Sequence, residues 1–132
     1  MKSSIEYRKI LNDPMWNDDE EYLRHAVYDE IKAGIGDVIA FVRCYDEEDY
    51  IDLLEMFEIA EIWIDSSYGT GYKKNENAKT LARHMAKTLT NSMYFNRSFE
   101  ISSSAKTSII IKNIGAILST FSEEDEQWFQ LH

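Results

Sequence analysis

Apolar residues recur every three or four positions through the first half of the chain, and this spacing is typical of amphipathic helices. Ser3 and Glu6 have the spacing of a capping box, so we expect a first short helix to begin there. Pro14 should end it, because the residue before a proline is disfavoured in the helical conformation. The pattern then predicts a second helix from about Asn17 to the glycines of 34–36.

Two periodicities compete in the middle of the chain. Residues 37–45 fit either a helical stripe or a short buried strand, and we interpret them as a helix. Asp46 is placed to cap the next helix, in which Phe57 is the last core position. The run 59–65 reads Ile-Ala-Glu-Ile-Trp-Ile-Asp, and its β-branched and aromatic residues predict a strand.

The second half changes from helical to alternating patterning. Residues 77–93 predict a helix whose basic side chains lie away from its apolar face, and Ser122 is placed to cap a short terminal helix. Segments rich in β-branched residues predict a meander: 98–103, 107–112 and 116–121, the last two joined by a turn at 113–115. The expected fold is therefore α+β, with N-terminal helices followed by a small, mostly antiparallel sheet of about four strands, one intervening helix and a short C-terminal helix.

The length of 132 residues, with 44% hydrophobic and 29% charged residues, fits a single domain. We expect a helical acidic part over about 1–58 and a strand-helix-meander part over about 59–132. Cys44 is the sole cysteine in the sequence, which excludes an internal disulfide, and its apolar surroundings predict a buried thiol. No apolar run reaches the length of a membrane span, so we expect a cytoplasmic protein with no membrane partner.

The charges are unevenly placed along the chain, which has a net charge of -10. Residues 1–65 hold 18 Asp and Glu against 6 Lys and Arg, whereas residues 66–121 hold 2 against 8. Such a division concerns partners and steering, not the fold. It predicts two outward-facing regions of opposite sign, unless the two sets of charges neutralise each other within the molecule.

The acidic half leads to the first functional hypothesis. Acidic surfaces attract basic partners and can imitate the phosphates of a nucleic acid. We therefore expect a small interaction protein, of the inhibitor or immunity type, that blocks a basic protein such as a nuclease or a nucleic-acid-binding protein. The candidate partner-binding residues lie at two predicted helix starts: Asp18, Asp19, Glu20, Glu21, Asp46, Glu47, Glu48 and Asp49.

The basic segment leads to an alternative, a nucleotide- or nucleic-acid-binding module. A glycine-bearing loop precedes the 77–93 helix, and backbone amides of such a loop can converge on an anion. The spacing of the loop does not match a Walker A motif or a dinucleotide fingerprint. The candidate anion-binding residues are Gly69, Thr70, Gly71, Lys73, Lys74, Lys79, Arg83, His84 and Lys87. A second alternative is a homo-oligomer in which the acidic half of one copy docks on the basic segment of the next.

The sequence holds no complete catalytic or metal-binding motif. Glu21, His25 and Asp29 share one face of the second predicted helix, but that face is opposite its apolar stripe and should carry solvated side chains. No serine has the setting of a nucleophile elbow. We therefore expect a binding protein without catalytic residues, metal or cofactor.

Overall fold

The computed structural model describes residues 1–13, 20–97, 109 and 111–121, and within them the chain forms helices and no strand. The elements are α1 (Ser4–Leu11), α2 (Glu20–Val42), η2 (Glu47–Asp49), α3 (Tyr50–Tyr68), η3 (Gly71–Lys74) and α4 (Glu76–Asn96). A further helical stretch covers 111–121 and is called the 111–121 helix. The predicted α+β fold is therefore wrong, and the described part of the chain is an all-helical bundle.

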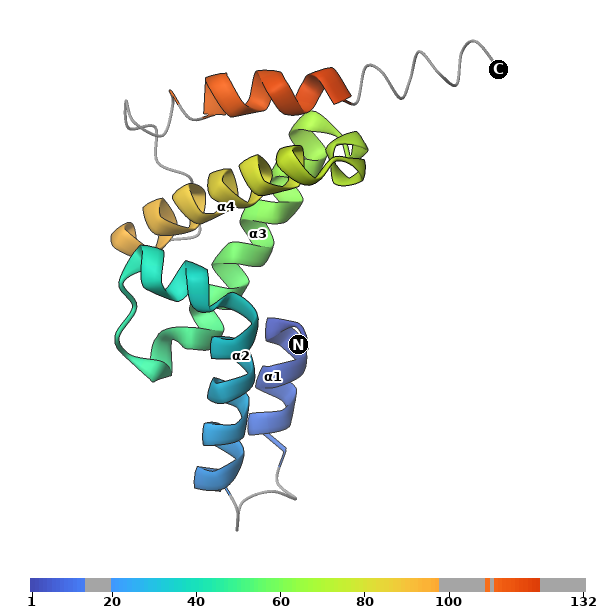
Figure 1. The fold of residues 1–132 in the computed structure, drawn as a ribbon. Helices are drawn as coiled ribbons and strands as arrows, with labels where there is room; N and C mark the ends of the chain where they lie inside the picture. The colour runs from blue at the N-terminus through green and yellow to red at the C-terminus, as the bar shows by residue number, and fades with distance from the viewer. Residues whose placement is uncertain (14–19, 98–108, 110, 122–132) are drawn as a thin grey trace.

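The helices cross one another in two groups that α3 connects (Figure 1). α1 and α2 lie side by side and run in opposite directions, and α3 then rises diagonally through the molecule. α4 folds back across α3, and the 111–121 helix lies along the top of this crossing. α3 consequently contacts α1, α2 and α4, which makes it the central element of the fold.

Local hydrogen bonds begin the helices as the capping pattern predicts. The Ser3 hydroxyl accepts a hydrogen bond from the backbone N–H of Glu6 at 3.2 Å, and this confirms the predicted start of α1. The Asp46 carboxylate accepts from the N–H of Glu48 at 3.0 Å, which caps η2 where the chain turns into α3. Each of these bonds satisfies a backbone donor that has no partner within its own helix.

α2 continues through the glycines of 34–36, which the sequence predicts as its end. Ile35 has the non-helical angles φ -125° and ψ 31°, so the glycines produce a kink and the helix then resumes as far as Val42. This confirms the helical interpretation of 37–45 over its first six residues. The kink turns the Gly34 carbonyl toward α4, where it accepts a hydrogen bond from Arg83 Nη2 at 3.5 Å.

The core lies where α3 and α4 cross, and the predicted apolar face of α4 is confirmed. Its fully buried side chains are Met85, Leu89 and Met93, together with the smaller Ala78 and Ala82. They pack against side chains of α3 that recur at helical spacing: Leu53, Leu54, Phe57, Ala60 and Ile64. These two hydrophobic faces pack against each other and determine how α3 and α4 cross.

The predicted strand at 59–65 is wrong, because this run is the second half of α3. Ala60 and Ile64 continue the buried stripe that begins at Leu53, and no glycine or proline interrupts the chain before Gly69. A β-branched residue loses only about 0.5 kcal/mol in a helix relative to alanine. Burying a large aliphatic side chain is worth about 1.5–3 kcal/mol, so packing overrides the local preference.

The predicted strands at 107–112 and 116–121 are also wrong over their described residues. Ile109 is helical, and 111–121 form one helix in which the predicted turn at 113–115 is an internal segment. Gly115 allows this helix to approach α3 closely, because a Cβ atom there would lie 2.5 Å from the ring of Tyr68. The strand predicted at 98–103 and the helix predicted after Ser122 lie outside the described residues.

Candidate functional site

Four of the cations predicted to bind an anion line one cleft between α3 and α4, and the predicted Lys74 and His84 do not. Its volume is about 690 Å³, and its charged lining includes Asp37, Glu61, Lys73, Lys79, Arg83 and Lys87. Lys79, Arg83 and Lys87 occur every fourth residue on α4, which places them on one side of the helix. The tertiary structure therefore brings together residues that the sequence could only place on a common face.

These cations are largely neutralised within the molecule. Arg83 makes a two-bond contact with Asp37, from Nε to Oδ2 at 2.8 Å and from Nη2 to Oδ1 at 2.7 Å. Lys87 Nζ lies 3.7 Å from Oδ2 of the same carboxylate. These contacts hold the pKa of Asp37 at about 2, chiefly through the hydrogen bond from Arg83.

The remaining cations of the cleft have carboxylates of their own. Lys73 Nζ lies 2.8 Å from Asp65, which also accepts a hydrogen bond from the hydroxyl of Tyr72. Lys79 pairs with Glu76 one helical turn away at 3.2 Å. The positive charge of the α3–α4 cleft is thus engaged by carboxylates of the chain itself, and little of it is left there to attract an anion.

The glycines of the predicted anion-binding loop lie at the ends of helices, where they serve the turn of the backbone. Gly69 has φ 75° and ends α3, and Gly71 begins η3 after Thr70. Lys74 is exposed at the end of η3. His84 is exposed on α4 and stacks edge-to-face on Phe41 of α2, with 5.9 Å between the ring centroids.

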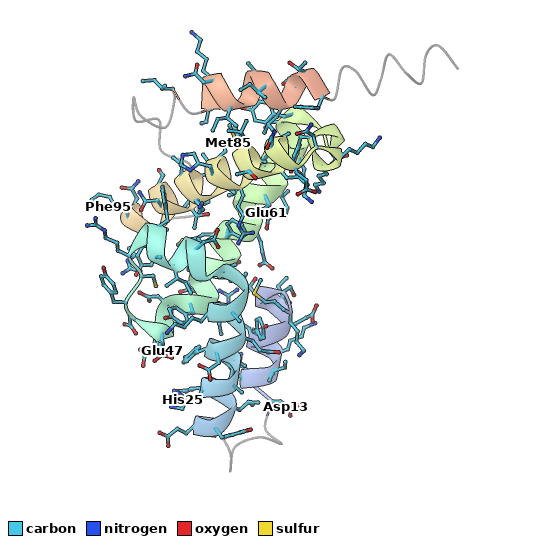
Figure 2. The ribbon with its side chains drawn as sticks, in the orientation of Figure 1. Asp13, His25, Glu47, Glu61, Met85 and Phe95 are labelled. Atoms are coloured by element: carbon cyan, nitrogen blue, oxygen red, sulfur yellow. The ribbon has the colours of Figure 1, made fainter. Side chains whose placement is uncertain are left out.

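The predicted acidic residues fall into two sets. Asp18 and Asp19 lie outside the described residues, as does the side chain of Glu20, whereas Glu21 is exposed on α2. In the second set, Asp46 serves as a cap and Glu47 and Glu48 are exposed. Figure 2 shows Glu47 at the corner where the chain passes from α2 to α3, well separated from Glu61.

The last residue of the second set has partners. Asp49 Oδ2 accepts hydrogen bonds from the hydroxyl of Tyr94 and from Arg97 Nη1, each at 3.0 Å. Its charge therefore joins the start of α3 to the end of α4 and is engaged within the fold. Glu47 and Glu48 have no ion-pair partner among the residues that the structure describes.

A second hollow, which the sequence reasoning missed, lies between the start of α1 and the second half of α3. This α1–α3 groove has a volume of about 500 Å³ and combines isoleucines with carboxylates: Ile5, Glu55, Glu58, Ile59, Glu61 and Ile62. Glu55, Glu58 and Glu61 are three residues apart, so they follow one another along α3. The assignment of 59–65 as a strand concealed this spacing.

A signal for the groove is present in the sequence. No Lys or Arg occurs between Arg43 and Lys73, although this stretch contains nine Asp and Glu residues. In a helix, carboxylates at such density form a continuous acidic side. Exposed isoleucines lie beside them, since 61% of Ile5 and 65% of Ile62 is accessible.

The carboxylates of the groove differ in how they are held. Glu55 receives Arg8 Nη2 at 2.6 Å, and Glu58 accepts hydrogen bonds from the hydroxyl and the N–H of Ser4. Glu61 lies where α3 passes between α1 and α4 (Figure 2), and it lines both the α1–α3 groove and the α3–α4 cleft. Desolvation raises the pKa of Glu61 despite the attraction of Arg83.

Catalytic and metal-binding chemistry gains no support within the described residues. No group of three or more His, Cys, Asp or Glu side chains there is arranged to hold a metal ion, and Glu21, His25 and Asp29 are simply exposed along α2. Cys44 is buried, and burial raises the pKa of its thiol, which disfavours the reactive thiolate. No described helix combines the length and the apolar character needed to cross a membrane.

The chain was compared with the profiles of known protein families, with curated proteins and with solved structures, and none of the three comparisons gives a match.

Proposed function

We propose that this protein is a small acidic interaction protein of the inhibitor or immunity type, which binds a basic protein in the cytoplasm and blocks it. The observation that carries the proposal is the difference between the two kinds of charge. The cations of the α3–α4 cleft are paired with carboxylates of the same chain, whereas Glu47, Glu48 and Glu61 face outward without an ion pair among the described residues. The negative charge is therefore the charge that a partner meets.

This distribution supports a binding role through two physical effects. A net charge of -10 steers a basic protein toward the acidic side of the molecule and speeds their encounter. Glu58, which Ser4 already holds by two hydrogen bonds, loses little side-chain entropy on binding. A partner whose nucleic-acid site is covered in this way could no longer bind its substrate, which is the blocking action proposed here.

The proposal is tested by affinity capture from the cells that produce the protein, at 50 mM and at 500 mM NaCl. We expect capture of a basic protein at the lower salt concentration and its release at the higher one, because salt screens attraction between exposed charges. We also expect heparin, a polyanion, to compete. Capture of neutral or acidic proteins alone, or capture that salt does not change, would contradict the proposal.

A pair of variants with equal net charge separates a specific acidic surface from general attraction. Glu47→Gln/Glu48→Gln and Thr80→Lys/Asn91→Lys each raise the net charge by two, and all four positions are exposed. We expect the first variant to reduce capture more strongly than the second, because the α4 positions lie outside the acidic regions. Equal effects would show that only the total charge matters.

A further inference from the structure

We infer that the α1–α3 groove is the docking site for an amphipathic helix of the basic partner. This inference rests on the proposed function and adds the position of the contact and the kind of segment that occupies it. Aliphatic side chains of the bound helix would cover Ile5, Ile59 and Ile62, and Lys or Arg side chains beside them would meet Glu58 and Glu61.

The apolar surface of the groove is the first reason. Ile5 and Ile62 come from different helices, and each remains more than half exposed although both border one hollow. The core beside them is complete, since Ala60 and Ile64 on the adjacent side of α3 are fully buried. Two exposed isoleucines around a shared depression form a surface that a partner can remove from water.

The shape and the backbone of the groove favour a helix as the occupant. The groove follows α3 from Glu55 to Asp65, which at 1.5 Å per residue is about 15 Å, or about three turns of a bound helix. A bound strand would need unpaired backbone N–H and C=O groups along one edge of the site. Both walls of this groove are α-helices, and at the start of α1 the N–H groups of Ser4 and Glu6 are bound by the side chains of Glu58 and Ser3, so the walls offer no such edge.

The charge of the groove favours a basic occupant. Its carboxylates alternate with its isoleucines along α3, so an aliphatic stripe with cations on both sides would match it in register. The chain's own residues 122–132 contain four Asp and Glu and no Lys or Arg, and they would meet like charge in this groove. A second copy of the protein would bring its own excess of negative charge.

The inference is tested with a designed peptide as the probe, measured by fluorescence polarisation at 100 mM NaCl. The peptide has 14 residues, with leucines at positions 3, 7 and 10 and lysines beside them on the helix, and a scrambled peptide of equal composition is the control. We expect the designed peptide to bind at least ten times more tightly than the scrambled one. Equal binding would mean that charge alone attracts them and would overturn the inference, as would the absence of binding.

The variant Ile62→Asp distinguishes the groove from the rest of the acidic surface. It adds a negative charge, which by itself strengthens the attraction of a cationic peptide, yet we expect it to weaken binding at least tenfold. Ile117→Asp makes the same change at an exposed isoleucine of the 111–121 helix, and we expect it to alter binding less than twofold. Circular dichroism of both variants confirms that they are folded, and unchanged binding by Ile62→Asp would overturn the inference.

The same variant separates this inference from the proposed function. If the protein captures its basic partner and Ile62→Asp captures it equally well, the function stands and the groove is not the contact. If the wild-type protein captures no basic protein, the function itself fails. Sedimentation that shows a dimer of the wild-type protein, lost in Ile62→Asp, would assign the groove to a second copy and overturn the inference.

Discussion

Replacement of Asp37 by asparagine tests how strongly the ion pairs hold the two helical groups together. Asp37 lies on α2 after its kink and contacts two cations of α4, Arg83 and Lys87. Asparagine has nearly the same shape as aspartate and keeps a side-chain oxygen that can accept a hydrogen bond. Asp37→Asn therefore removes the charge and leaves the local geometry of the helix in place.

The magnitude follows from the pKa of the carboxyl group. A fall from the usual 3.8 to about 2 corresponds to about 2.5 kcal/mol of interaction with the charged form. The side chains of Asp37 and Arg83 are 41% and 42% exposed, so solvent screens much of this energy. We therefore expect Asp37→Asn to reduce the free energy of unfolding by about 1 kcal/mol, and the melting temperature by about 3–5 °C.

The pH dependence has a definite sign. Because the pKa of Asp37 is lower in the folded state, its contribution to stability is complete above about pH 4 and is lost as the pH falls toward 2. The difference in unfolding free energy between wild type and Asp37→Asn should therefore be constant from pH 5 to 7. It should shrink below pH 4 and nearly vanish at pH 2.

Urea unfolding at pH 7 and at pH 3, at 50 mM and 500 mM NaCl, measures these differences. Glu76→Gln is the matched control, because Glu76 pairs with Lys79 at a position where the carboxylate is 90% exposed, and we expect almost no loss of stability there. The reasoning would be refuted if Asp37→Asn lowered the free energy of unfolding by less than about 0.3 kcal/mol. It would also be refuted if the difference between wild type and variant did not depend on pH.

Two further predictions concern the packing of the 111–121 helix and the carboxylate of Glu61 on α3. Gly115→Val should destabilise the protein by about 1–3 kcal/mol, because the valine side chain would collide with the ring of Tyr68. Ala116→Val, at the exposed neighbouring position, should change stability much less. Thermal unfolding followed by circular dichroism measures both variants. Glu61→Gln should raise the urea midpoint at pH 7, because desolvation raises the pKa of Glu61 and the charged form therefore opposes folding above that pKa. The gain in stability should disappear as the pH falls below the usual pKa range of a glutamate. A variant that is less stable than wild type at pH 7 would contradict this prediction.

The local features of the helices could be predicted from the sequence. The cap at Ser3, the cap at Asp46 and the apolar face of α4 around Met85 all depend on residues within four positions of one another. Such interactions are decided within a single turn of helix, so the order of residue types is sufficient to identify them. The uneven distribution of charge along the chain is likewise a property of the sequence.

The sequence alone could not settle whether residues 59–65 and the described residues of 107–121 form strands or helices. β-branched residues favour strands by less than 1 kcal/mol, and whether Ile64 or Leu118 is buried on a helix or a sheet depends on what it packs against. The close approach that Gly115 permits is visible only when Tyr68 is in place, 47 residues earlier in the chain. The loss of the predicted sheet follows from these contacts.

The sequence by itself determined where α1 begins and where the chain turns into α3, which side of α4 is apolar, and that the protein carries an excess of negative charge. Only the tertiary structure decided which charges are paired within the chain and which stay exposed. It placed Asp37 between Arg83 and Lys87, 46 and 50 residues away, and joined Ile5 to Ile62 around an acidic groove. The physical reason is that charge neutralisation and the formation of a groove depend on distances in space, and the crossing of α3 with its neighbours sets those distances.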